Sequence, residues 1–564
     1  MGCCMNNSIL SLSSPSTSTS TFRILGDLQV GLRVTANPYG LPLDALFALA
    51  ARMNKKRGFL FVSKLLGKHI PVAPHTPLLA GAALALLLAG ELGLATGLAM
   101  TGMQSGEATD EPAADSRIEA EERSRERRLQ DSQASPKSGE PELLERLLQL
   151  TVAGLVDPAQ AEDAYRAIID SALLPAEPVK FIGFAETATA LGHSMYQAFA
   201  GGCTYIHTTR ELLPERKSLL NFEEEHSHAT THRCYAADPG VLDGEAPVVL
   251  VDDEMTTGRT ALNIIRDIHR QYPRRTYYVA ALLDWRTAED ERRFADLVDE
   301  LGVTIKPLSL IKGELSAAGL PPDTGGGPLT AAQMDGAAGG AGAERGARLD
   351  GGAAEEAGTG SGPDAAAAST PEEAGRGDQR RYGDVQVLRL EHPFAQVAAV
   401  SADGAGVTNA APYLTCTGRF GLDASSLIAT DRFVLHAAEA LRAHRSGGPL
   451  LCMGTGEFMY IPLRIAALLG EDVSFQSTTR SPIYPHDQPG YGVRSGFTYA
   501  SPEDPEVRHF MYNIAPGQYD ELFVFMEREV DEARLAPMRE VLQRLGIPRV
   551  IIIVFTGTCE KREG

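Results

Sequence analysis

The sequence has few of the features that mark nucleic-acid-binding or disulfide-rich proteins. Its formal net charge of -21 and pI near 5.1 leave no excess of Lys and Arg, which a surface needs to neutralise nucleic-acid phosphates. The seven cysteines are widely spaced except for Cys3-Cys4, and none forms a C-x-x-C pair. A zinc ribbon or a disulfide framework is therefore not indicated. We expect no nucleic-acid partner and a reducing compartment.

Long apolar runs are also scarce. Residues 77–100 are apolar over a length that could span a bilayer, but Glu91 and several glycines interrupt them. Because a central carboxylate is costly in a bilayer, a buried helix pair is favoured and a membrane partner is unlikely on sequence grounds.

The first 21 residues are rich in Ser and Thr and contain no acids. They resemble a disordered leader or the start of an organellar transit peptide. Residues 1–6 begin like an N-acylation site, but Asn6 stands where Ser or Thr is preferred. We expect a cytoplasmic protein, with a plastid or mitochondrion as the alternative if the leader is a transit peptide.

A chain of 564 residues exceeds what one hydrophobic core usually serves, so we expect two domains plus linkers. Two segments lack the apolar residues needed to bury a core, one rich in charge and one in Gly, Ala and Glu. The predicted organisation is a disordered leader at 1–21, a first domain at 22–312 with a disordered insert at 104–140, a linker at 313–380, a second domain at 381–557 and a tail at 558–564.

Short apolar runs alternate with helical segments between the two inserts, and this alternation predicts a parallel α/β sheet. The runs lie at 181–183, 203–207, 248–251 and 276–283. Ligands of such sheets bind beyond the carboxyl ends of the strands. The residues that directly follow these runs are therefore the candidates for chemistry.

The run 248–251 is followed by two acids, Asp252 and Asp253, and then by a Thr/Gly-rich turn that opens a helix. The turn comprises Thr256, Thr257, Gly258, Arg259 and Thr260. Backbone N–H groups at a helix start and Thr hydroxyls suit a phosphate, and glycine permits the tight turn. Adjacent carboxylates accept hydrogen bonds from ribose hydroxyls and help to hold Mg²⁺ on a pyrophosphate. The pattern describes a site for a phosphorylated ribose, and the alternative is an ordinary strand-turn-helix with capping Thr and Asp.

Residues 248–260 resemble the signature by which type I phosphoribosyltransferases bind 5-phosphoribosyl-1-pyrophosphate (PRPP). That signature has four apolar residues, two acids, two apolar residues and a Thr-rich phosphate turn. Glu254 departs from it, at a position that is normally aliphatic, and would alter metal or ribose contacts or point to solvent. The resemblance implies an α/β fold with a type I phosphoribosyltransferase-like parallel sheet flanked by helices, PRPP as ligand and Mg²⁺ as cofactor. It assigns the ribose and the metal to Asp252 and Asp253.

The resemblance extends upstream to residues 183–192, where this fold holds pyrophosphate. It implies that Ala185, Glu186 and Thr187 contact the pyrophosphate, and that Arg210, after the next strand, meets it with a positive charge. Taken alone, the first segment is equally an ordinary helix start, and Arg210 an ordinary surface arginine.

Residues 221–232 lie where these transferases carry a mobile loop that closes over PRPP and excludes water. We expect Glu225 and His226 to act in this loop. His226, His228 and His232 also have the short spacing of zinc ligands. Ordinary surface histidines are the third interpretation.

These motifs, together with residues 59–69 and 477–482, look like phosphoribosyltransferase-like proteins encoded in bacterial tellurite-resistance clusters. Their C-terminal domain is named TRSP after Thr-Arg-Ser-Pro, which stands here at 479–482. The resemblance covers roughly 22–312 and 381–557. It implies the synthesis or salvage of a nucleoside-like metabolite and leaves the acceptor open.

The second domain contains an echo of the first. Glu186 precedes Arg210 by 24 residues, and Glu457 precedes Arg480 by 23, each glutamate in a Gly-x-x-Glu turn. We therefore interpret the second α/β domain as a candidate degenerate copy, with a chance match as the alternative. Residues 530–535 replace the Thr-Thr-Gly turn with acids, which repel phosphate, so we predict that this copy does not bind PRPP.

Together these features predict a Mg²⁺-dependent phosphoribosyltransferase that uses PRPP to glycosylate an unknown small, base-like acceptor, with a homodimer as one expected assembly. The alternative is a non-catalytic regulatory protein that binds PRPP or a nucleotide. A third interpretation is a hydrolase that uses the same acids and metal on a ribosyl phosphate.

Overall fold

The structure is a computed structural model of the 564-residue chain. It describes residues 18–53, 58–93, 140–171, 173–175, 177–199, 201–223, 231–319, 384–391 and 395–556. Nearly all of the predicted insert at 104–140, most of the predicted linker and the tail at 558–564 lie outside these ranges.

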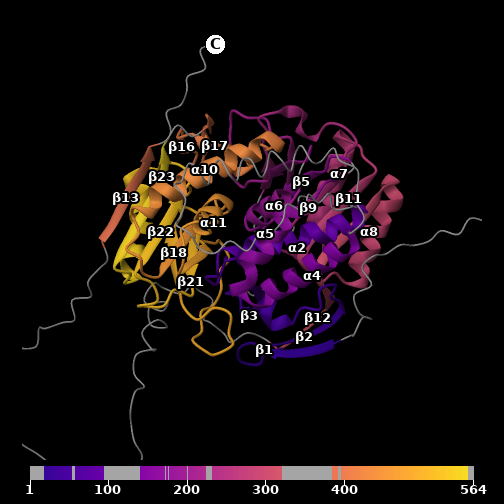
Figure 1. Cartoon of the computed structure of the whole chain (residues 1–564), viewed down its shortest axis with the longest axis horizontal. Helices are drawn as coiled ribbons and strands as arrows, with labels where there is room; N and C mark the ends of the chain where they lie inside the picture. Colours follow the sequence, from indigo (N-terminus) through magenta and orange to yellow (C-terminus); the bar gives the residue numbers. More distant parts are fainter. Residues whose placement is uncertain are drawn as a thin grey trace, which may run out of the picture.

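The first half of the chain is organised by a mostly parallel sheet of order β1-β2-β12-β11-β9-β5-β6, with β10 paired to β11 (Figure 1). Strands β12 to β6 run parallel, and β1 and β2 add an antiparallel edge. The strands are β1 (Ser18–Arg23), β2 (Gln29–Ala36), β5 (Lys180–Gly183), β6 (Thr204–His207), β9 (Val248–Val251), β10 (Glu254–Met255), β11 (Thr276–Asp284) and β12 (Thr304–Ala318). All four residues of β9 are buried, as expected for a strand covered on both faces.

Two ends of this sheet differ from the predicted boundaries. β1 begins at Ser18, inside the range assigned to the leader, and β12 continues to Ala318, six residues into the predicted linker. Both segments pair with β2. The predicted boundaries rested on the content of apolar side chains. Backbone pairing with a distant strand does not require such side chains, so the predicted ends of the first domain lie too far inward.

The helices of the first half pack on this sheet and on one another. They are α2 (His75–Leu92), α4 (Glu140–Val156), α5 (Ala161–Ser171), α6 (Ala188–Gln197), α7 (Arg259–Gln271) and α8 (Ala288–Leu301). α2 contacts α4, α5 and α6, and α6 packs on β5 and β6. Gly81 allows the approach of α2 to α6, because a Cβ atom there would lie 2.4 Å from the Cβ atom of Ser194.

α2 is long and apolar enough to cross a membrane by length and composition, and 78% of its most apolar window is buried inside the protein. A core helix passes the same test, so the helix is weak evidence for a membrane span. The sequence favours a buried helix pair at 77–100. The described part of that range is a single buried helix, and residues 94–100 lie outside the description.

The second half is organised by a parallel sheet of order β13-β23-β22-β18-β19. Its strands are β13 (Asp384–Glu391), β18 (Leu450–Gly454), β19 (Val473–Ser477), β22 (Glu521–Met526) and β23 (Arg549–Thr556), and its helices are α10 (Ala424–Arg442), α11 (Tyr460–Ala466) and α12 (Glu532–Arg544). This confirms the predicted fold class of two successive α/β regions.

The two sheets share a connection pattern. β5 lies between β6 and β9 just as β18 lies between β19 and β22. In the first half, β6 is followed by a hairpin of β7 (Leu220–Glu223) and β8 (Thr231–Cys234). In the second half, β19 is likewise followed by a hairpin of β20 (Gly496–Ala500) and β21 (Arg508–Tyr512). The edge strands differ, since β12 ends the first half whereas β13 begins the second. This shared topology supports the interpretation of the second half as a copy of the first.

The two halves meet along a broad junction. One hydrophobic core contains residues of both halves, and α6 packs on α11, where the His193 ring stacks on Tyr460 at 3.6 Å between centroids. Single β-bridges join Tyr205 to Leu422 and Leu49 to Tyr491. The remaining short elements are α1 (Leu43–Leu46), β3 (Phe47–Ala51), β4 (Phe59–Ser63), η1 (Pro158–Gln160), η2 (Pro239–Leu242), β14 (Gln396–Val397), β15 (Ser401–Ala402), β16 (Thr408–Asn409), β17 (Tyr413–Leu414) and η4 (Thr415–Thr417).

Candidate functional site

The two predicted acids lie at the carboxyl end of β9 and are half-buried. Asp252 Oδ1 accepts a hydrogen bond of 2.9 Å from the backbone nitrogen of Asp253. The ammonium group of Lys68 is 3.9 Å from Asp253 Oδ2. Lys68 belongs to the segment 59–69, which the sequence marked only as part of a wider resemblance. A cation therefore faces this acidic end of the strand from a distant part of the chain.

Carboxylates at a strand end are among the groups that can hold Mg²⁺ together with a phosphorylated ligand. Mg²⁺ is commonly held by one or two carboxylates together with phosphate oxygens and water. Within the residues that the structure describes, no group of three or more His, Cys, Asp and Glu side chains is arranged to hold a metal ion. Asp252 and Asp253 would thus need the oxygens of a ligand to complete the coordination of the ion.

The predicted phosphate turn lies between β10 and α7, which starts at Arg259. Gly258 has a φ of +69°, and a Cβ atom there would lie 2.5 Å from the ring of Phe294. The turn therefore needs glycine for both its conformation and its packing. Because the turn stands at the amino end of a 13-residue helix, the helix dipole favours an anion there.

A buried ion pair packs close to this turn. Arg286 donates to Asp284 at 2.7 and 2.9 Å, and both side chains are almost fully buried. The Arg286 guanidinium lies 4.2 Å from the ring centroid of Phe294, the ring that packs on Gly258. Sequence reasoning missed this pair, although its position at the carboxyl end of β11 was a signal that could have drawn attention to it.

The predicted pyrophosphate segment follows β5 and is buried at the junction between the halves. The peptide bond between Ala185 and Glu186 is cis, and the Ala185 nitrogen donates to Thr208 Oγ1 at 2.9 Å. Ala185, Glu186 and Thr187 are all buried. Glu186 Oε2 accepts a hydrogen bond of 3.3 Å from the backbone nitrogen of Arg480 in the second half.

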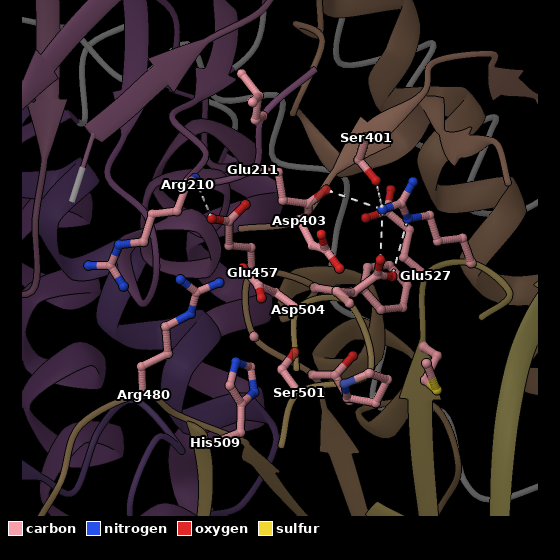
Figure 2. Close-up of a pocket in the computed structure, with 18 of the residues that line it drawn as sticks. Arg210, Glu211, Ser401, Asp403, Glu457, Arg480, Ser501, Asp504, His509 and Glu527 are labelled. Atoms are coloured by element: carbon pink, nitrogen blue, oxygen red, sulfur yellow. Dashed lines mark hydrogen bonds and ion pairs between the residues drawn. The ribbon is translucent and has the colours of Figure 1, made fainter. Parts of the chain in front are cut away.

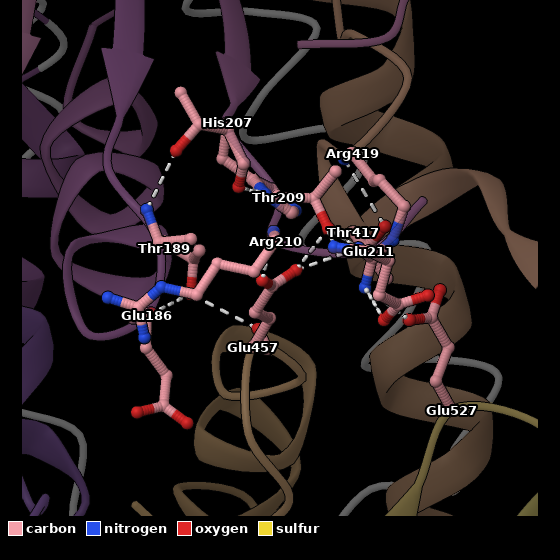
Figure 3. A network of polar contacts seen from close by, with 12 residues as sticks. Glu186, Thr189, His207, Thr209, Arg210, Glu211, Thr417, Arg419, Glu457 and Glu527 are labelled. Carbon is pink, nitrogen blue, oxygen red and sulfur yellow. Dashed lines mark hydrogen bonds and ion pairs between the residues drawn. The ribbon is translucent and has the colours of Figure 1, made fainter. Parts of the chain in front are cut away.

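The second half makes the equivalent contact with the first half. Glu457, which follows β18, accepts hydrogen bonds from the Arg210 nitrogen at 2.8 Å and from Thr209 Oγ1 at 2.6 Å (Figure 3). Its carboxylate also pairs with the buried guanidinium of Arg419 at 2.8 Å. The predicted site residue Arg210 is thus held in place by a side chain of the other half.

Arg419 is the centre of a buried charged cluster and pairs also with Glu527 at 3.1 Å and Glu211 at 3.4 Å (Figure 3). Burial by itself would raise the pKa of Glu457, but the charges of Arg419 and His207 and the hydrogen bonds from Thr209 and Arg210 together outweigh burial and lower that pKa to about 2. For Glu527, burial outweighs the same arginine and the pKa is raised. Glu457 is therefore ionised against Arg419 at neutral pH.

The turns of the two halves repeat further contacts. The Gly456 nitrogen donates to Thr478 Oγ1 at 3.0 Å, matching the bond from Ala185 to Thr208. Thr208 Oγ1 lies 3.2 Å from Nδ1 of His232, and Thr478 Oγ1 lies 3.2 Å from Nδ1 of His509. The sequence similarity between residues 183–210 and 454–480 is therefore accompanied by matching hydrogen bonds in the two halves.

The predicted catalytic loop residues Glu225 and His226 lie outside the described residues, as does His228. The zinc interpretation of the three histidines therefore stays a prediction. His232 is described and buried, and its Nε2 atom lies 3.4 Å from Nε of Arg210. Arg419 and His509 were missed by sequence reasoning because no local motif surrounds either residue.

Comparisons with known proteins relate the chain to a protein family. A family model described as phosphoribosyl transferase matches residues 46–314, and a model described as the TRSP domain C-terminal to that transferase matches residues 416–545. No curated protein sequence matches the chain significantly.

Solved phosphoribosyltransferases resemble the chain only distantly. Adenine phosphoribosyltransferase from Trypanosoma brucei is 16% identical, with 27% of this chain and 66% of that chain covered and a TM-score of 0.20. The enzyme from Rhodothermus marinus is 16% identical, with coverage of 27% and 84% and a TM-score of 0.18. Orotate phosphoribosyltransferase from Mycobacterium tuberculosis is 13% identical, with coverage of 30% and 73% and a TM-score of 0.15. These matches carry no argument about substrate.

Since the two family models together span more than half of the chain, the protein belongs to the phosphoribosyl transferase family whose members carry a C-terminal TRSP domain.

Proposed function

We propose that the protein is a Mg²⁺-dependent phosphoribosyltransferase that uses PRPP to glycosylate a base-like acceptor. The observation that carries the proposal is the arrangement of Asp252 and Asp253 at the end of β9, two residues before the glycine-dependent turn at the start of α7. This arrangement supports the proposal because carboxylates can bind ribose hydroxyls, a helix start can bind a phosphate, and both lie at one edge of the sheet.

In the proposed reaction, a nitrogen of the acceptor attacks C1 of the ribose while the bond from C1 to the pyrophosphate oxygen breaks. Asp252 and Asp253 bind the ribose hydroxyls and orient the ring, and residues 256–260 bind the 5′-phosphate. Fixing both ends of the ribose phosphate aligns C1 for attack and lowers the entropic part of the barrier. A Mg²⁺ ion, when bound by the two acids and the ligand, would offset negative charge on the departing pyrophosphate.

On the pyrophosphate side, we propose contacts from Ala185, Glu186, Thr187 and Arg210. Arg210 supplies a charge that attracts pyrophosphate, and the bond from Glu457 to its backbone nitrogen supports its position. Glu225 and His226 are proposed to close the site and to exclude water from the reacting carbon. The acceptor class is proposed as base-like because the family model describes a phosphoribosyl transferase.

One observation favours the alternative of a regulatory protein that binds PRPP without transferring its ribose. Ala185, Glu186 and Thr187 are each at most 6% exposed, and one Glu186 oxygen is engaged by the second half. A pyrophosphate would have to displace this packing in order to reach the segment. Binding with no turnover against any acceptor would identify this alternative.

The test is calorimetric titration of PRPP, with and without Mg²⁺, into the wild-type protein and an Asp252→Asn/Asp253→Asn variant. We expect Mg²⁺-dependent binding to the wild type and a loss of binding in the variant, which keeps the shape of both side chains. Glu289→Gln, an exposed change on α8, serves as the control and should bind PRPP like the wild type. Absence of binding to the wild type would refute the proposal.

A further inference from the structure

A cavity of about 350 Å³ lies at the carboxyl edge of the second sheet, where the first half closes over it (Figure 2). Its walls include residues that follow β18, β19 and β22, together with residues 210–212 and Arg233 from the first half. This volume is within the range of small-molecule sites, about 300–1,000 Å³. The cavity occupies the position, relative to its sheet, that the PRPP motif occupies on the first sheet, which is the edge where α/β sheets bind ligands.

One wall of the cavity presents hydrogen-bond donors. The side chains of Arg210 and Arg480, one from each half, lie on the same side of the cavity in Figure 2. Within the part of the chain that the structure describes, the Arg480 guanidinium forms no ion pair closer than 4.0 Å. Two arginines from different halves that converge on one wall make a favourable environment for an oxyanion.

His509 adds a third donor to this wall. The residue is 5% exposed, and its Nε2 atom has no hydrogen-bond partner among the described residues. Thr478 Oγ1 accepts from the Gly456 nitrogen, so its own proton is available to Nδ1 of His509 at 3.2 Å. In the tautomer that accepts this proton at Nδ1, the neutral ring carries its own proton on Nε2 and can donate it to a ligand. Burial lowers the pKa of His509 to about 4, so the ring is neutral at pH 7.

Most of the carboxylates that line the cavity have other cations as partners. Glu503 pairs with Arg528 at 2.7 Å, and Asp403 pairs with Arg534. Glu457 and Glu527 share Arg419. Asp504 accepts a hydrogen bond of 3.2 Å from the Gly404 nitrogen. Its half-buried carboxylate, together with Ser501, lies on the cavity wall and can accept hydrogen bonds from ligand hydroxyls.

The chain after β22 limits what this cavity can hold. Glu527 and Arg528 stand where Asp252 and Asp253 follow β9, and α12 starts without a Thr- or Gly-containing turn. The Thr- and Gly-containing turn before α7 therefore has no counterpart before α12, which leaves the side beside β18 and β19, with Arg480, as the place for a phosphate.

We propose that this cavity is a second binding site for a small phosphorylated sugar, which borders the proposed PRPP site and shares Arg210 with it. The phosphate binds Arg480, Arg210 and Nε2 of His509, and the sugar hydroxyls face Asp504 and Ser501. The proposal does not depend on transferase activity, because every group that carries it except Arg210 lies in the second half.

The experiment is calorimetric titration of the full-length Asp252→Asn/Asp253→Asn protein with ribose 5-phosphate, inorganic phosphate and ribose, each in the absence of Mg²⁺. This background impairs the first site. We expect ribose 5-phosphate to bind at least about tenfold more tightly than phosphate or ribose, since only it engages both walls. Equal affinity for phosphate and ribose 5-phosphate would overturn the assignment to a phosphorylated sugar.

The position of the site is tested by adding Arg480→Gln or His509→Gln to the same background. Arg480→Gln should weaken ribose 5-phosphate binding at least about tenfold, because it removes a charge-assisted contact. Arg508→Gln, at an exposed position on the same hairpin, is the matched control and should bind normally. Denaturation midpoints of all variants report whether they fold.

Binding that is unchanged in Arg480→Gln would place the ligand elsewhere, for example at the turn before α7, and would overturn the proposal. Absence of PRPP binding to the wild-type protein would contradict only the proposal for the first site. The two proposals therefore fail in distinguishable ways.

Discussion

Glu457 Oε1 lies 2.8 Å from the backbone nitrogen of Arg210, although 247 residues separate the two in the chain. The reverse contact, from Arg480 to Glu186, spans 294 residues. Each half therefore holds the turn that follows an edge strand of the other half, β6 or β19.

Removing the Glu457 carboxylate should destabilise the whole protein. Glu457→Ala leaves Arg419 short of a partner in a buried site, and breaking such a pair typically costs about 3–5 kcal/mol of unfolding free energy. The measurement is urea unfolding. Glu300→Ala removes an exposed partner of Arg266 and should cost less than about 1 kcal/mol. Similar costs for the two variants would contradict the central role of the buried pair.

The contribution of Glu457 should disappear in acid. The pKa of Glu457 in the folded protein is about 2, below the ordinary glutamate value of 4.5, so its stabilising effect is complete above pH 4.5 and is lost as the pH falls toward 2. The difference in unfolding free energy between the wild type and Glu457→Gln should be constant from pH 7 to pH 5 and shrink below that. A difference that stays constant down to pH 3 would show that ionisation of Glu457 is unimportant.

Gly258→Ala should disrupt the turn before α7 more than a glycine change at another helix end. Both Gly258 and Gly302 have a left-handed φ, but only at Gly258 would a Cβ atom collide with a neighbouring side chain. We expect Gly302→Ala to cost about 1–2 kcal/mol from backbone strain and Gly258→Ala to cost more and to weaken PRPP binding. Thermal unfolding and calorimetry measure the two effects. Equal losses in stability would show that the Phe294 ring yields freely.

The thiols should divide into two classes of reactivity. Of the seven cysteines, four are buried and free, namely Cys203, Cys234, Cys416 and Cys452. Burial raises the pKa of Cys203 to about 11 and of Cys234 to about 12, which suppresses the reactive thiolate. Titration of the native protein with a thiol reagent should therefore modify at most Cys3, Cys4 and Cys559 rapidly, and denaturant should expose the rest. Rapid modification of Cys203 or Cys234 would contradict their burial.

The sequence alone determined the parts of the protein that depend on neighbouring residues. The apolar run at 248–251, the acids after it and the glycine-containing turn predicted a buried strand, an acidic strand end and a helix start, and β9 and α7 confirm this local order. The echo between residues 183–210 and 454–480 likewise predicted a second α/β region. Strand periodicity, turn residues and helix starts are local properties, so they are legible in one sequence.

Only the tertiary structure decided which charges meet. Nothing near Arg419 in the sequence marks it as the partner of Glu457 and Glu527, and composition did not reveal that β12 continues to Ala318 by pairing with β2. The cavity between the halves arises from their packing, as does the burial that sets the pKa values of Glu457 and His509. These properties depend on which distant segments exclude water from a side chain, and that is settled by the folded arrangement of the whole chain.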